Sequence, residues 1–217
     1  MQGEGTHFGA VIRAIVYQQL SGKAASTIHD RFLALYENQE PAPAQILATS
    51  DAALRAVGLS RAKARYVKDL AERVENTGLP IERLHELGDN AVMDALVQVK
   101  GIGRWTAHMF LLFRLGRPDV LPELDLGVQK AIQLVYHLRR LPTPEQVRKR
   151  GAVWSPYASV ATWYLWRSLE LPSETAHATP KRPVPKRPAR TKRARPAPAR
   201  RATRAPRRRT PARTRRA

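Results

Sequence analysis

The chain has 217 residues, enough for one or two domains with a sizeable core, and no cysteine, which excludes disulfides, cysteine-ligated zinc and iron–sulfur clusters. No run of about 18 apolar residues occurs, and polar residues follow Met1, so neither a membrane span nor a secretory signal is predicted. The 38 Lys and Arg residues against 18 Asp and Glu give a formal net charge of +20, which indicates a polyanionic partner.

Apolar residues recur at helical spacing along most of the chain, and no alternating stretch of strand length occurs. The helices expected from this spacing cover residues 7–20, 23–37, 44–48, 51–57, 61–74, 90–99, 104–115, 126–138, 144–153 and 156–166. The sequence therefore predicts an all-α fold of about ten helices with short connections.

Helix starts are marked by capping residues, with Ser21, Ser60, Asp89 and Thr143 as the expected N-caps. The helix over 104–115 is apolar nearly all round, which predicts a central place in the core. Two later helices are expected to bury the following side chains: Leu126, Ala131, Ile132, Leu134, Val135 and Leu138 in one, and Val160, Trp163, Tyr164 and Trp166 in the other.

The first helix ends in two amides, Gln18 and Gln19, which are followed by Ser21 and Lys23. Amides at a helix end are usually only solvated. Because a serine and a lysine lie beside them here, a turn that faces DNA is the alternative interpretation.

A tight turn follows Lys100, formed by Gly101, Ile102 and Gly103. Two glycines around one apolar residue allow positive φ and bring backbone N–H groups to the surface, just before a helix starts. Such a hairpin is a place for a phosphate, and Thr106 lies in the helix that follows it. The alternative is an ordinary corner between two helices. The turn is no dinucleotide fingerprint, because no strand precedes it and the third glycine is missing.

Asp125 comes about 20 residues after the hairpin, at the end of a loop that contains Pro118 and Pro122. Asp is strongly favoured at helix N-caps, so capping alone would account for this residue. If the hairpin holds the DNA backbone, however, this carboxylate is expected to place a negative charge beside one sugar.

The charge is concentrated in the last part of the chain: residues 181–217 contain 17 of the Lys and Arg residues and no acidic residue, which leaves 21 basic and 18 acidic residues for residues 1–180. We expect a globular domain over 1–175 and a disordered basic tail over 176–217. Such a tail binds polyanions through counterion release. A solubilising extension or a localisation signal is the alternative.

Two motifs carry a resemblance to a known family. The stretch LVQVKGIGRWTAHMFLL, followed by RPDVLPELDLG, resembles the helix-hairpin-helix DNA glycosylase superfamily. In that superfamily the hairpin and a Gly/Pro-rich loop end in a catalytic Asp. The resemblance implies a helix-hairpin-helix glycosylase fold of two lobes, with the active site between them.

Three further motifs are similar to the 3-methyladenine DNA glycosylase II (AlkA-type) branch of this superfamily: YQQLSGKAAS, GLSRAKARYVKDLA and WSPYASVATWYLW. The resemblance covers about residues 7 to 170 and does not include the tail. It implies a DNA glycosylase that removes alkylated purines, of the 3-methyladenine and 7-methylguanine type, by flipping the nucleotide out of the duplex.

The resemblance also implies roles for individual residues. Asp125 is implied as the catalytic carboxylate that assists the attack of water, and Trp105, Met109 and Trp166 as the base pocket. Two residues depart from the family pattern: Met109 stands where an aromatic residue lines the pocket of a well-known member, and Gln19 stands at an apolar wedge. Core packing is the alternative for the two tryptophans. Residues implied or expected at the DNA are Gln18, Gln19, Ser21, Lys23, Lys100, Gly101, Ile102, Gly103 and Thr106.

Members that also cut the DNA strand use a lysine in the helix after the hairpin, where this chain has Trp105. The resemblance therefore implies a monofunctional, intracellular, DNA-associated monomer that acts on double-stranded DNA with alkylated bases. It needs no cofactor, and a monovalent cation at the hairpin is left open. A non-catalytic architectural DNA-binding protein is the alternative, followed by a bifunctional glycosylase/lyase.

Overall fold

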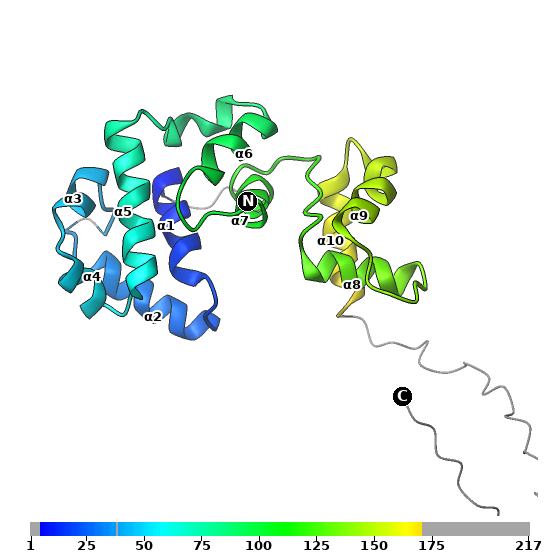
Figure 1. Cartoon of the computed structure of the whole chain (residues 1–217), viewed down its shortest axis with the longest axis horizontal. Coiled ribbons are helices and arrows are strands. Elements are labelled where there is room, and N and C mark those ends of the chain that lie inside the picture. Colours follow the sequence, from blue (N-terminus) through cyan, green and yellow to red (C-terminus); the bar gives the residue numbers. More distant parts are fainter. Residues whose placement is uncertain (1–4, 38, 171–217) are drawn as a thin grey trace, which may run out of the picture. The chain divides into compact units, whose positions relative to one another are not determined.

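The computed structural model describes residues 5–37 and 39–170, and within these ranges every regular element is helical (Figure 1). The α-helices are α1 (His7–Tyr17), α2 (Gly22–Leu33), α3 (Pro43–Ala48), α4 (Asp51–Ala56), α5 (Arg61–Asn76), α6 (Asp89–Val97), α7 (Arg104–Met109), α8 (Leu126–Val135), α9 (Pro144–Gly151) and α10 (Ala158–Ser168). Two 3-10 segments, η1 (Ile81–Glu86) and η3 (Ala152–Trp154), and one π-helical turn, η2 (Phe110–Arg114), complete them. The predicted all-α class is confirmed.

The basic tail lies outside the described residues, and so does the predicted boundary at residues 175 and 176. Among the described helices, none is long and apolar enough to cross a membrane.

Two of the four expected N-caps, Ser60 and Thr143, are confirmed by side-chain hydrogen bonds. The Ser60 hydroxyl accepts a hydrogen bond from the Lys63 N–H at 3.2 Å, and Thr143 forms a capping box at α9. Two expected caps differ. Ser21 occupies the N-cap of α2 without a side-chain bond to the helix, and Asp89 is the first residue of α6, after Gly88 at the N-cap.

The described chain has two hydrophobic cores. The first is built from α1 to η2, where α1 contacts α2, α5, η1 and η2 and places Ile12 and Ile15 at its centre. The second is smaller: α8 packs on α9 and α10 around Val128, Ile132 and Leu165. The predicted organisation in two lobes is confirmed, and the chain passes from one to the other between η2 and α8.

The structure corrects several burial predictions. Exposed rather than buried are Leu126, Leu134 and Val135 of α8, Val160, Trp163 and Tyr164 of α10, and Trp105 and Phe113 of α7 and η2. The small second lobe covers only one face of each of its helices, namely Val128, Ala131 and Ile132 in α8. When a helix has two apolar faces, the periodicity of its sequence does not show which of them packs in the core.

Candidate active site

The Asp125 carboxylate lies where the two lobes meet. It caps α8, with Oδ1 accepting the Val128 N–H at 2.8 Å. Oδ1 also accepts the indole N–H of Trp166 at 2.9 Å, and Oδ2 accepts the indole N–H of Trp105 at 2.7 Å. Trp105 comes from α7 and Trp166 from α10, so the structure brings together the carboxylate and both tryptophans that the sequence singled out.

The charge of this carboxylate is not cancelled by a neighbour. A carboxylate offers about four lone-pair positions to donors, and three are used here by uncharged N–H groups. Within the described part of the chain, Asp125 forms no ion pair. One acceptor position and the full negative charge therefore remain for a bound molecule.

Gly127 allows the Trp166 indole to approach Asp125 so closely. A Cβ at this position would lie 2.9 Å from Asp125 Oδ1 and 3.0 Å from Trp166 Cδ1. Both distances are too short for a normal carbon contact. Sequence reasoning missed this glycine, because nothing in the sequence indicates which side chain crosses the first turn of α8.

We predict that Gly127→Ala displaces the Trp166 indole from Asp125. Overpacking of this kind costs about 1 to 3 kcal/mol in unfolding free energy. In an NMR spectrum the Trp166 indole N–H resonance should move, while that of Trp105 changes less. Gly88→Ala is the matched control, because its Cβ would meet nothing within 4 Å. If the Trp166 resonance stays in place in a folded Gly127→Ala protein, the contact of Trp166 with Asp125 does not depend on the space left by Gly127.

Two exposed aromatic rings lie beside the carboxylate or its partner: Trp105, which donates to Asp125, and Phe113, which is stacked on Trp166. The Phe113 ring is stacked on Trp166 with a centroid distance of 5.8 Å and an interplanar angle of 16°. Phe113 is 60% exposed and Trp105 is 44% exposed, which is unusual for rings of this size. Phe113 was not predicted to belong to the site. It lies in the π-helical turn η2, four residues after Met109. These rings provide flat apolar surfaces that a ligand could cover.

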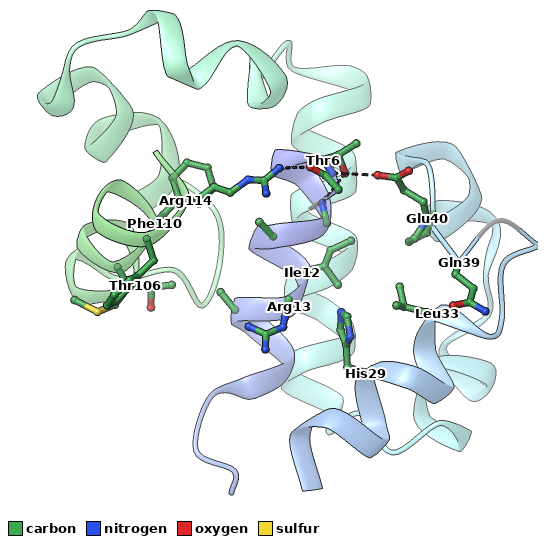
Figure 2. A pocket seen from close by; sticks show the side chains of 17 residues that line it. Thr6, Ile12, Arg13, His29, Leu33, Gln39, Glu40, Thr106, Phe110 and Arg114 are labelled. Carbon is green, nitrogen blue, oxygen red and sulfur yellow. Dashed lines mark hydrogen bonds between the residues drawn. The ribbon is translucent and has the colours of Figure 1, made fainter. Parts of the chain in front are cut away.

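A groove of about 750 Å³ adjoins this site and is not centred on it. Figure 2 shows its walls: Thr106 and Phe110 on one side, Leu33 and Glu40 on the other, with α1 between them. Met109 and Phe113 also line it, whereas Asp125 does not. We therefore expect the reaction at the Asp125 carboxylate rather than in the groove. The groove begins at Met109 and Phe113 and extends away from Asp125.

The hairpin before α7 has the backbone expected from its glycines. Gly101 has φ of +83°, and a Cβ there would lie 2.2 Å from the Tyr66 ring, so only glycine fits. Ile102 is buried, and its N–H donates to the Val99 carbonyl at 3.0 Å. The N–H groups of Gly101 and Gly103 donate to no group among the described residues and remain available.

Lys100 is held by a carboxylate. Its backbone N–H and its Nζ both contact Asp69, each at 2.9 Å, and Arg73 donates to the same carboxylate. Burial alone would raise the pKa of Asp69, but the hydrogen bonds from Lys100 and Arg73 outweigh it and lower this pKa. Lys100 therefore fixes the hairpin to α5. That Lys100 also contacts DNA stays a prediction.

The turn after α1 lies against the hairpin. The Gln18 side-chain N–H donates to the Gly101 carbonyl at 2.8 Å. Lys63 of α5 donates from Nζ to the Val16 and Gln18 carbonyls, both at 2.7 Å, which satisfies the end of α1. Burial lowers the pKa of Lys63. The turn after α1 and the hairpin, both predicted to face DNA, are therefore neighbours. The sequence did not predict that Gln18 contacts the hairpin or that Lys63 binds the end of α1.

The rest of this turn is exposed. Gln19 has φ of +58°, which ends α1 earlier than predicted and carries its side chain to the surface. Ser21 and Lys23 are exposed as well, and so is the apolar Leu20. Gln19, Ser21 and Lys23 can reach a ligand that lies along the hairpin; that they do so stays a prediction.

Known proteins resemble this chain in both sequence and fold. Residues 12–156 match the family model described as HhH-GPD superfamily base excision DNA repair protein. The chain belongs to the HhH-GPD superfamily. The resemblance stated from the motifs is confirmed, including the 3-methyladenine glycosylase branch, because relatives with that name are found.

One such relative is DNA-3-methyladenine glycosylase 1 of Schizosaccharomyces pombe, which is 36% identical over 174 residues; the match covers 79% of this chain and 76% of the relative. The solved structure of the Schizosaccharomyces pombe enzyme Mag1 with abasic DNA matches with a TM-score of 0.67 at 34% identity, covering 78% of this chain and 84% of Mag1. The DNA-3-methyladenine glycosidase of Bacillus halodurans matches with a TM-score of 0.70 at 36% identity, covering 77% of each chain.

Proposed function

We propose that this chain is a monofunctional DNA glycosylase that hydrolyses the N-glycosidic bond of alkylated purines in double-stranded DNA. The single observation that carries this proposal is the Asp125 carboxylate, uncancelled by any cation among the described residues and held by the N–H edges of Trp105 and Trp166. The relatives named above are glycosylases for 3-methyladenine, and one of them is bound to abasic DNA in its solved structure.

The reaction needs little from the protein beyond binding and a negative charge. Alkylation at N3 or N7 makes the purine cationic, so the base leaves with the electron pair of the bond to C1′. The sugar becomes oxocarbenium-like, and the Asp125 anion stabilises this positive charge. Water then adds to C1′, and the acceptor position left on Asp125 orients it and takes its proton.

The flipped base is proposed to bind among the aromatic rings at this site, of which Trp105 and Phe113 are exposed and Trp166 is partly buried. A cationic purine is attracted to the faces of Trp105 and Trp166 through cation–π contact and stacking. Phe113 adds a third ring beside Trp166. Met109 replaces an aromatic ring with a flexible side chain, which gives the pocket a shape that adapts to different bases.

DNA binding is proposed to use the hairpin and the turn beside it. The free N–H groups of Gly101 and Gly103 suit a phosphate, and Lys23 adds a positive charge. Gln19 extends into solvent next to them, where it fills the gap left by the flipped nucleotide through hydrogen bonds. We expect one protein chain to act on one lesion.

A panel of duplexes, each with one lesion, tests the proposed function. Duplexes containing 3-methyladenine or 7-methylguanine should lose the free base, faster than a duplex with the neutral base hypoxanthine. The strand should remain intact until alkali treatment, and borohydride should trap no protein on the DNA, because Trp105 replaces a lysine nucleophile. No base release from any duplex, or a borohydride-trapped adduct, would contradict the proposal.

Truncation after Pro180 should weaken DNA binding and reduce its salt dependence. The deleted segment contains 17 Lys and Arg residues, and the slope of log K against log salt becomes shallower by about 0.9 for each phosphate that the protein no longer neutralises. The ranking of lesions should not change. A full-length variant with these residues changed to Gln is the control for chain length. An unchanged slope in both variants would mean that the tail does not bind DNA.

A further inference from the structure

A buried carboxylate lies two residues before Asp125. Glu123 is only 3% exposed, and both of its oxygens face basic side chains. Oε1 lies 3.1 Å from Arg148 of α9 and 3.7 Å from Arg104 of α7, and Oε2 lies 3.7 Å from His108 of α7. The reaction described above makes no use of this group.

These contacts join the Asp125 loop to the helix that carries Trp105. Arg104 and His108 are one helical turn apart, and Trp105 lies between them in the sequence. On the other side, the Gln129 side chain donates to the Glu123 carbonyl at 2.9 Å, which ties the same residue to α8. Glu123 is therefore connected to both partners of the hydrogen bond between Trp105 and Asp125.

The side chains of Arg148 and Arg104 face the Glu123 carboxylate from two different helices. Burial is the main cause that lowers the pKa of His108, so this imidazole binds a proton less readily than a free histidine does. Arg148 and Arg104 therefore supply the positive charge opposite the carboxylate. Only the carboxylate in these ion pairs is buried, because the Arg104 and Arg148 side chains are both 57% exposed. Removing one partner of such a pair leaves the other without its counter-charge, which is costly when the group is buried.

We propose that Glu123 is a positioning residue, which holds α7 against the Asp125 loop so that the Trp105 indole reaches Oδ2. Its effect on catalysis rests on the proposed function; its effect on geometry does not. The 2.7 Å hydrogen bond from Trp105 to Asp125 joins α7 to the same loop that Glu123 contacts. Without the charge on Glu123, α7 is released and this hydrogen bond lengthens.

Glu123→Gln tests the geometry in the full chain, with the indole N–H resonances as the readout. The Trp105 resonance should move upfield as its hydrogen bond weakens, whereas that of Trp166, which binds the other oxygen from α10, should stay. Glu82→Gln is the matched control. Glu82 accepts two backbone N–H bonds at the start of α1, so its loss lowers stability without a link to Trp105.

The same variant tests the catalytic consequence. With DNA bound, we expect Glu123→Gln to lower kcat for base release about tenfold with little change in KM, since misplacement acts on the reacting geometry. If Glu123→Gln does not fold, Glu123→Asp is the second variant. Its shorter side chain keeps the charge but moves it away from α7, so the Trp105 resonance should move in the same direction. An unmoved Trp105 resonance or an unchanged kcat in the folded variant overturns the proposal. A wild type without glycosylase activity overturns the proposed function instead, and the resonance still decides the positioning role.

Discussion

Asp125→Asn should reduce base release at least about 100-fold, the size of effect seen when one preorganised electrostatic group is removed from an active site. The substitution keeps the size and shape of the side chain and removes its charge. Without the anion, nothing among the described residues at this site stabilises the oxocarbenium-like sugar. Binding to DNA with an abasic-site analogue should change little, because the hairpin and the turn after α1 are untouched.

The measurement is the single-turnover rate of base release at saturating protein. Trp105→Phe is the matched control, because an Asn side chain also places an amide N–H opposite the Trp105 N–H and loses that hydrogen bond. Trp105→Phe loses the same bond but keeps the charge, so it should be much less impaired. Equal activity of wild type and Asp125→Asn would remove the catalytic role of Asp125.

Gly101→Ala should disrupt the hairpin and with it DNA binding. The new Cβ would lie 2.2 Å from Tyr66, and alanine is strained at φ of +83°. Together these effects should cost about 2 to 4 kcal/mol in unfolding free energy. Because the free N–H groups lie in this turn, affinity for undamaged and damaged DNA should fall together.

Gly103→Ala provides the matched control for Gly101→Ala. Gly103 has φ of −96°, and its Cβ would meet nothing within 4 Å. The Gly103→Ala protein should therefore have the same unfolding midpoint in denaturant as the wild type. Combining Gly101→Ala with Tyr66→Ala should restore part of the stability, since it relieves the steric clash and leaves the backbone strain. A Gly101→Ala protein with wild-type stability and affinity would contradict this view of the hairpin.

Local patterns in the sequence were sufficient for most of the helices, for the caps Ser60 and Thr143 and for the placement of Asp125 at the start of α8. Capping by Ser60 and Thr143 depends on residues within one turn, so their effects can be predicted from short stretches. The convergence of Trp105 and Trp166 on Asp125 was expected from the resemblance alone. Composition and spacing contain no information on a contact between residues 41 positions apart.

The missed features all depend on such distant contacts. The contact of Lys100 with Asp69 was not expected, because Asp69 lies 31 residues away on another helix. Phe113 reaches Trp166 because a π-helical turn follows α7, which apolar periodicity does not predict. Glu123 resembles any charged loop residue until the fold buries it among basic side chains from two helices.

We propose that one charged carboxylate, Asp125, drives hydrolysis of alkylated purines. The most direct measurement is the identification, by mass spectrometry, of bases released from methylated duplex DNA by the wild type and by Asp125→Asn at equal DNA occupancy. We predict free methylated purines and intact strands with the wild type, and almost no release with the variant. The same bases released at the same rate by both proteins would contradict the account.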